Sequence, residues 1–379
     1  MKFNAFRKHT ICLTILGVRP PGGVKWKWLG VLLDIYLIVQ LFCIATWGYL
    51  FFQGAFLYLP DAFMDRIVGV SAAVSVLGSL AKLITFRRKG HVLKELFDQL
   101  GGFPVNTARG RLVAKVVTIY EVSVAAIVVT HNMHIAIDPQ IHRSSPYWTA
   151  SMTSGTKQDI IRDYLFNLDS AIVALSANVI GDTLFLILTN QICHRLLLLA
   201  ETVASIGKGI RPLEGLSVPE DATDEEVIRR CVDEHNLLLK MTKQVEELYD
   251  RIFLVQLVYS CSDACLTLFT ISQYEDFVEA MNQLLPQFIS LFLEIFLFCW
   301  GGQMINNHFE RLHLASYDSE WYSLDEKNRS SILVIQTFTG RPVNVTSTSI
   351  FHMNFHTYET ICKEVFSYYT IMRQLFSQK

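Results

Sequence analysis

The chain has 379 residues, a formal net charge of −2 and 18% charged residues, whereas an average soluble domain carries about 25%. Hydrophobic residues make up 51% of the chain, and the mean hydropathy is +0.30. This composition excludes a disordered chain, which needs low hydrophobicity and high net charge. The missing basic excess argues against nucleic acid as a partner.

Long apolar runs indicate helices that cross a membrane, because a spanning helix needs about 20 mostly apolar residues. We therefore predict an all-α membrane protein, a single domain over residues 1–379 with seven transmembrane helices, placed in the cell membrane as a multi-pass protein in contact with lipids. The seven predicted spans cover residues 28–58, 66–86, 112–137, 166–199, 249–272, 277–305 and 347–375, the last being the most polar.

The distribution of Lys and Arg predicts the orientation of the chain, since cytoplasmic loops are enriched in both. The segment before the first span and every second connection after it are rich in basic residues, and the other connections are poor in them. We expect a cytoplasmic N-terminus and an extracellular C-terminus, which is the reverse of a G-protein-coupled receptor.

The sequence pattern of residues 224–248 predicts a helix that continues the fifth span beyond the membrane. Thr223 and Glu226 form a T-x-x-E capping box at its start. Its apolar residues recur at three- and four-residue spacing, and this stripe either packs inside the chain or contacts another subunit. The stripe consists of Val227, Cys231, Leu238, Met241, Val245 and Leu248.

Ionisable residues inside the predicted spans are costly and point to a bundle interior or to water. Asp182, in the middle of the fourth span, needs a partner. We expect Lys82 to extend its ammonium group toward the cytoplasmic interface beside Arg87. The seventh span, with His356 and Glu359, is the best candidate to line an ion path.

The motifs of common enzyme classes are absent. The sequence has no G-x-x-x-x-G-K-[ST], H-E-x-x-H, G-x-S-x-G or C-x-x-C pattern. The pairs His131/His134 and His352/His356 have helical spacing, but no third ligand stands at a convincing distance in the sequence. We expect no enzyme activity, no metal and no cofactor.

Motifs in the last third resemble those of the insect odorant receptor family. These are Phe298–Gln303 (FCWGGQ), Ala315–Asp325 (ASYDSEWYSLD), Arg341–Pro342 and Phe366–Leu375 (FSYYTIMRQL), with Gly181–Phe185 (GDTLF) in the fourth span. The order of these motifs and the inverted seven-span layout carry the resemblance over the whole chain.

The resemblance implies a subunit of an odorant-gated, non-selective cation channel in the dendrite of a sensory neuron. It implies a heterotetramer with a co-receptor subunit, a cytoplasmic anchor from about residues 200–250 and 306–345, and a pore helix over about residues 347–375. The co-receptor has a long insertion between spans four and five, whereas this chain has only a compact connection there. The chain therefore resembles a tuning subunit.

The resemblance also places the gate and the ligand pocket. It implies that Ile371, Gln374 and Leu375 line the pore, and that a small volatile organic ligand binds in the outer half of the bundle. Arg373, among the gate residues, is expected to point to the membrane interface. The pocket candidates, chosen by depth and side-chain type, are Ser71, Val74, Ser75, Ile127, Thr130, His131, His134, Ala174, Asn178, Gln283, Leu284 and Gln287.

Three alternatives stay open at this point. A gustatory receptor would form a homomeric ligand-gated cation channel, but the ending from Ser367–Tyr368 to Gln374–Leu375 favours the odorant branch. A G-protein-coupled receptor would have the opposite orientation, and the D-R-Y and N-P-x-x-Y motifs are absent. A transporter is disfavoured because no inverted pair of broken helices is visible.

Overall fold

The computed structural model describes residues 7–18, 27–53, 63–100, 108–137, 157–209, 216, 219, 222–273 and 277–377. These residues are almost entirely helical. In chain order the elements are α1 (Arg7–Ile15), α2 (Lys27–Gln53), α3 (Phe63–Arg88), α4 (Gly90–Leu100), α5 (Ala108–Ile137), α6 (Lys157–Ala204), α7 (Asp224–Gln273), α8 (Phe277–Tyr317), the 3₁₀ turn η4 (Trp321–Ser323), α9 (Glu326–Thr339), β1 (Thr346–Ser347), β2 (Phe351–His352) and α10 (Phe355–Ser377).

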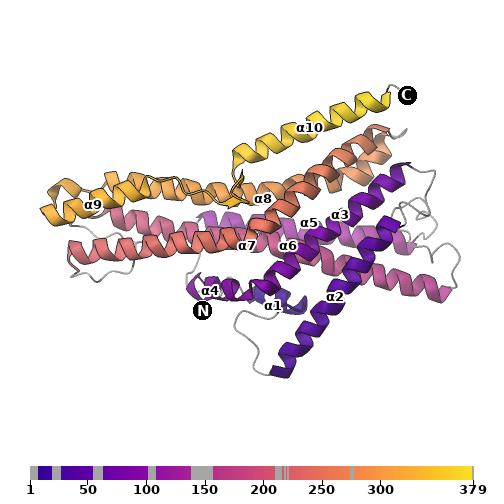
Figure 1. Ribbon diagram of the computed structural model, residues 1–379, viewed down its shortest axis with the longest axis horizontal. Coiled ribbons are helices and arrows are strands. Elements are labelled where there is room, and N and C mark those ends of the chain that lie inside the picture. The colour runs from indigo at the N-terminus through magenta and orange to yellow at the C-terminus, as the bar shows by residue number, and fades with distance from the viewer. Residues whose placement is uncertain are drawn as a thin grey trace.

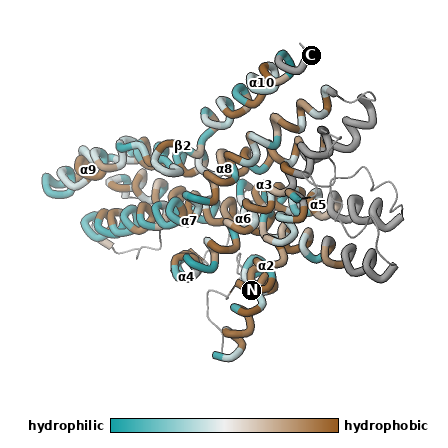
Figure 2. Tube along the Cα trace, turned by 45° about the vertical axis from the view of Figure 1, so that its right-hand side comes forward, coloured by the Kyte–Doolittle hydropathy of each residue, from teal (hydrophilic) through white to brown (hydrophobic). Residues whose placement is uncertain are grey.

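The long helices form an elongated bundle in which α6, α7 and α8 run along the longest axis (Figure 1). Helices α2 and α3 lie side by side and cross this axis obliquely, and α10 rises away from the other helices toward the C-terminus (Figure 1). Hydrophilic segments of α4, α7 and α9 gather at one end, while hydrophobic segments fill the middle (Figure 2). The bundle thus has the polarity pattern of a protein that crosses a membrane and extends beyond it on one side.

The predicted spans correspond to α2, α3, α5, α6, α7, α8 and α10. Within the described part of the chain, four segments are long and apolar enough to cross a membrane by length and composition: Lys27–Leu50, Leu168–Ala204, Asp224–Ser272 and Phe288–Ser323. Helices α6, α7 and α8 are much longer than a membrane is thick, because each continues past the apolar run.

The centre of the bundle is packed around aromatic rings. The Phe185 ring lies 4.9 Å from Tyr249 and 5.0 Å from Phe298, measured between ring centroids. Gly301 allows this contact between α6 and α8, because a Cβ atom there would lie 2.5 Å from the Phe185 ring. A side chain at this position would force the two helices apart.

The apolar stripe on α7 packs inside the chain, which decides between the two alternatives that the sequence left open. All six of its residues are buried within this single chain. Arg195 on α6 fixes the same region by a two-pronged ion pair, with its Nε and Nη2 atoms each 2.7 Å from a carboxylate oxygen of Glu234. On α4, Glu95 accepts a hydrogen bond from Lys240, and this contact lowers the pKa of the Glu95 carboxyl.

The last helix begins at Phe355 rather than near residue 347. The preceding residues form a small antiparallel hairpin, in which Thr346 pairs with His352 and Ser347 with Phe351. Two carboxylates of α7 hold this hairpin: the Thr346 amide donates to Glu246 at 2.9 Å, and the Thr348 amide donates to Asp250 at 2.5 Å. The backbone therefore satisfies its hydrogen bonds outside a helix here, so the last helix starts later than the sequence predicted.

Candidate functional site

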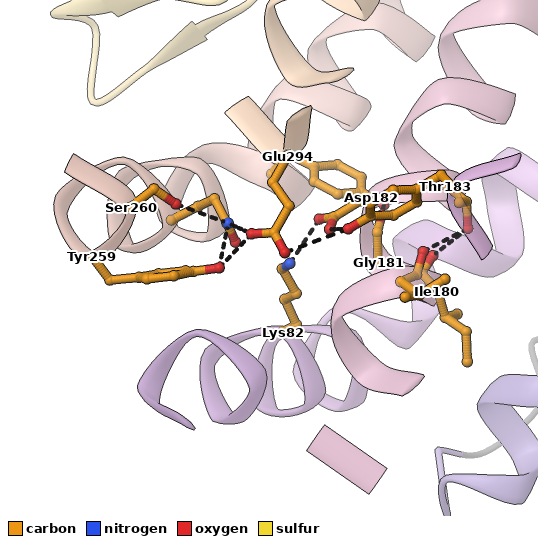
Figure 3. A network of polar contacts seen from close by, with 12 residues as sticks. Lys82, Ile180, Gly181, Asp182, Thr183, Tyr259, Ser260 and Glu294 are labelled. Carbon is orange, nitrogen blue, oxygen red and sulfur yellow. Dashed lines mark hydrogen bonds and ion pairs between the residues drawn. The ribbon is translucent and has the colours of Figure 1, made fainter. Parts of the chain in front are cut away.

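A buried polar network occupies the middle of the bundle (Figure 3). At its centre the Lys82 ammonium of α3 lies 2.7 Å from Oδ1 of Asp182 on α6, and both side chains are 1% exposed or less. Asp182 thus has the partner that the sequence required. The prediction that Lys82 extends to the cytoplasmic interface is wrong, because its side chain turns inward.

Gly181 explains how Lys82 reaches the interior. A Cβ atom at Gly181 would lie 3.0 Å from Cδ of Lys82. The missing side chain leaves room for the aliphatic stem of the lysine against α6. The two neighbouring residues thus have separate roles: Gly181 leaves space for the lysine stem, and Asp182 pairs with its ammonium group.

Tyr120 of α5 joins the two buried carboxylates of the network. Its hydroxyl donates to Oδ2 of Asp182 at 3.0 Å and lies 3.4 Å from Oε1 of Glu294 on α8. The other oxygen of Glu294 accepts hydrogen bonds from Gln256 and Tyr259 of α7. Figure 3 shows the Glu294 carboxylate between Tyr259 and Ser260 on one side and Asp182 on the other.

The network holds five helices together at one level, since its members come from α3, α5, α6, α7 and α8. Its formal charges are two carboxylates against one ammonium group. Buried charges are tolerated when they are paired and hydrogen-bonded, and this condition is met at Lys82 and Asp182. Glu294 receives its two short hydrogen bonds from the neutral side chains of Gln256 and Tyr259.

Four predicted pocket residues have described side chains. Val74 and Ser75 on α3 are half-buried, and Ala174 and Asn178 on α6 are buried. The two helices pack against each other, so these four residues belong to one part of the bundle. The Asn178 Oδ1 atom is buried and has no hydrogen-bond partner among the residues that the structure describes.

The other predicted pocket residues lie in helices whose backbone is described, but their side chains lie outside the described part of the structure. Their place in a pocket therefore stays a prediction. They are Ser71 on α3, Ile127, Thr130, His131 and His134 on α5, and Gln283, Leu284 and Gln287 on α8.

The polar network lies on the same helix faces as the predicted pocket residues. Seven and eleven residues are about two and three helical turns, so positions at these spacings share one face. Ser75 and Ser71 stand at these spacings from Lys82, and Gln287 and Gln283 stand at them from Glu294. Sequence reasoning missed that the network underlies the pocket candidates, although this register was available in the sequence.

The predicted pore residues lie on a helix that the chain covers on one side only. Helix α10 packs mainly on α7 and α8, and Ile361 and Val365 are buried there. Ile371 is 49% exposed, and Gln374 and Arg373 are exposed as well. The side chain of the third predicted pore residue, Leu375, lies outside the described part.

The short helix α1 contacts the network region from another side, which the sequence did not predict. The ring of His9 is buried and its Nε2 atom lies 3.0 Å from the hydroxyl of Thr183, the residue after Asp182. Burial, with a contribution from the neighbouring charge of Lys8, lowers the pKa of His9 to about 4. The ring is therefore neutral at physiological pH.

Comparison with known proteins identifies the family. A family-wide sequence pattern described as the 7tm odorant receptor matches residues 70–366. The chain belongs to the odorant receptor family. This membership supports the odorant branch over the gustatory, G-protein-coupled and transporter alternatives.

Individual odorant receptors are similar to this chain at low sequence identity. Odorant receptor 10 of Aedes albopictus is 18% identical over 43% of this chain and 44% of its own length. Odorant receptor 23a of Drosophila melanogaster is 22% identical over 50% of this chain and 47% of its own length. The chain thus spans less than half the length of these relatives.

Solved odorant receptor structures share the fold over nearly the whole chain. The insect olfactory receptor OR5 of Machilis hrabei superimposes with a TM-score of 0.80 at 17% identity, covering 98% of this chain and 97% of that one. The same receptor in complex with eugenol gives a TM-score of 0.79 at 18% identity. The seven-helix membrane fold predicted from the sequence is confirmed.

Proposed function

We propose that this odorant receptor is a tuning subunit of a non-selective cation channel. It binds a small volatile organic molecule in the outer half of its helix bundle and opens the channel together with a co-receptor subunit in a heterotetramer. Its N-terminus is cytoplasmic and its C-terminus extracellular, in the dendritic membrane of a sensory neuron. The anchor over residues 200–250 and 306–345 is its cytoplasmic part.

The exposed polar face of α10 carries this proposal. Intramembrane ionisable side chains face a bundle interior or water rather than lipid. The Glu359 and Lys363 side chains of α10 are 61% and 73% exposed and pair at 2.6 Å, and Glu364 and Gln374 are exposed too. A transmembrane helix with such a face needs a water-filled path beside it.

The cytoplasmic anchor offers a surface for neighbouring subunits. Large exposed apolar patches mark protein contacts, and the inner end of α8, η4 and α9 expose several large apolar side chains. An assembly of subunits would cover them. These side chains are Leu314, Tyr317, Tyr322, Leu333, Val334 and Phe338.

The ligand pocket is supported by the polar atoms at the middle of the bundle. Asn178 presents an amide oxygen that has no hydrogen-bond partner in the described part of the chain, and Ser75 and Ala174 lie on the neighbouring parts of α3 and α6. The Machilis hrabei receptor of similar fold was solved in complex with eugenol, a small volatile phenol. We place a small volatile ligand in the corresponding region of this chain.

Whole-cell current tests the proposal. Cells expressing this chain with an insect co-receptor, challenged with a panel of small volatiles, should show a ligand-evoked cation current. Cells expressing the chain alone should show none. An epitope on the C-terminus, labelled in intact cells, checks both surface delivery and orientation.

Three results of these experiments would contradict parts of the proposal. Current from the chain alone would contradict the requirement for a co-receptor. Label only after permeabilisation, together with a functional current, would contradict the orientation. Surface label without current for any volatile in the panel would contradict the channel function.

A further inference from the structure

Several hydrogen-bond acceptors in and beside the polar network lack a full partner among the described residues. Tyr120 has a single hydroxyl proton, and this hydroxyl is closer to Asp182, at 3.0 Å, than to Oε1 of Glu294, at 3.4 Å. Since the two short hydrogen bonds from α7 go to Oε2, Oε1 retains only this long contact in the described part of the chain. One carboxylate oxygen therefore lacks a full hydrogen bond.

Two further acceptors in the same region have no partner at all. The Oε1 atom of Gln256 and the Oδ1 atom of Asn178 are buried without a hydrogen bond among the described residues. Gln256 is fully buried and Asn178 is 7% exposed, so bulk water does not satisfy them. Buried polar groups are nearly always hydrogen-bonded in folded proteins.

The location of these acceptors connects them to the ligand pocket. Asn178 lies one helical turn outward of Asp182 on α6. Ser79 lies one turn outward of Lys82 on α3, and its buried hydroxyl also has no partner among the described residues. Asn178 and Ser79 thus lie on the outer side of the network and toward the predicted pocket, on helices that pack together.

We infer that this network is the floor of the odorant pocket and that it selects volatiles which donate a hydrogen bond. An alcohol, a phenol or an amine supplies the donor that Asn178 and Glu294 lack. An ether, an ester or a hydrocarbon of the same size leaves these acceptors unsatisfied, which costs affinity. This inference rests on the proposed function and goes further, because it names the chemical class of the ligand.

The charge of the network favours the same class. Asp182 pairs with the Lys82 ammonium, whereas the carboxyl group of Glu294 contacts only neutral side chains among the described residues. Hydrogen bonds that involve a charged group are stronger than neutral ones. A protonated amine or a hydroxyl donates to the Glu294 carboxyl group, and a ligand that carries only acceptor oxygens gains no such contact.

Matched ligands of equal size test the inference. Hexanol and methyl pentyl ether are isomers, and only hexanol donates a hydrogen bond; hexylamine is the charged counterpart. We expect half-maximal current at concentrations at least about tenfold lower for hexanol and hexylamine than for the ether, as one hydrogen bond to a charged group predicts. Equal potency of the three ligands would overturn the inference.

Two variants locate the preference at the floor. Asn178→Leu keeps the volume and removes the acceptor, and Glu294→Gln keeps the shape and removes the charge. Each should reduce the difference between hexanol and the ether to less than about threefold. Glu310→Gln, an exposed position on the same helix, is the control and should retain the full difference. A preference unchanged in both floor variants would overturn the inference.

A binding measurement separates this inference from the channel proposal. The full-length chain, purified in detergent, should melt at a higher temperature with hexanol or hexylamine than with the ether at equal concentration. This shift does not depend on current or on a co-receptor. A preference in melting without any current would contradict the channel function alone, whereas current without a preference would contradict the ligand class alone.

Discussion

Helices α6 and α10 cross the same membrane but differ in what surrounds them. The middle of α6 is covered on nearly all sides by this chain, and its Asp182 is fully buried. Helix α10 touches α7 and α8 along one face and exposes Phe366, Tyr368 and Ile371. One helix is covered by its own chain, and the other leaves a face exposed that neighbouring subunits would cover under the proposed function.

Two ion pairs of similar length differ in how far they are exposed to solvent on these two helices. Lys82 and Asp182 lie 2.7 Å apart and are buried, whereas Lys363 and Glu359 lie 2.6 Å apart on α10 and are exposed. Their lengths alone do not show which pair contributes more to stability. A buried pair is expensive to break because one charge is left without a partner, and an exposed pair is screened by solvent.

Breaking the buried pair should give the largest effect on stability. Lys82→Met leaves Asp182 buried and uncompensated, and we expect a loss of about 3 to 5 kcal/mol in the free energy of unfolding. Thermal unfolding of the purified receptor measures it. The matched variant Lys363→Met should leave the melting temperature unchanged. Equal losses in the two variants would show that α10 is as buried as α6.

The contact between α8 and the segment just before α10 should give the second-largest effect on stability. A Cβ atom at Gly302 of α8 would lie 2.0 Å from the carbonyl oxygen of Met353, just before α10. Gly302→Ala should therefore destabilise the fold by about 1 to 3 kcal/mol, as overpacking does. Gly90→Ala is the control, because nothing lies within 4 Å of a Cβ atom there. A harmless Gly302→Ala would mean that the hairpin moves freely.

The smallest effect on stability should come from the far end of α10. Gln374 is exposed, so Gln374→Leu should leave the melting temperature unchanged. Under the proposed channel function it removes a polar ring from the pore, and the calcium-to-sodium permeability ratio should shift by roughly twofold. Reversal potentials measure the shift, and Lys327→Gln on α9 is the control. An unchanged permeability ratio with intact current would show that Gln374 does not line the pore.

The sequence predicted the features that depend on local pattern. The apolar runs located the spans, and three- and four-residue spacing located the stripe on α7 that the structure finds buried. Thr223 caps the start of α7 as the motif predicts, with the Glu226 amide donating to its hydroxyl at 3.4 Å. Each of these follows from residues a few positions apart, where periodicity and composition carry the information.

The sequence failed where the partner is distant along the chain. Lys82 stands near Arg87 and Arg88, so its local surroundings suggested the interface, yet Asp182 on another helix determines its direction. The roles of Gly301 and Gly302 likewise depend on Phe185 and on the hairpin before α10. No periodicity in the sequence reports such pairings.

The hairpin before α10 clamps the first turn of that helix. Glu246 and Asp250 hold Thr346 and Thr348, and the backbone of Met353 is pressed against Gly302. Helix α10 then extends for 23 residues, or about 35 Å. A rod fixed at its base bends most at its tip, so any sideways force on α10 displaces the segment with Ile371 and Gln374 furthest and leaves the base in place.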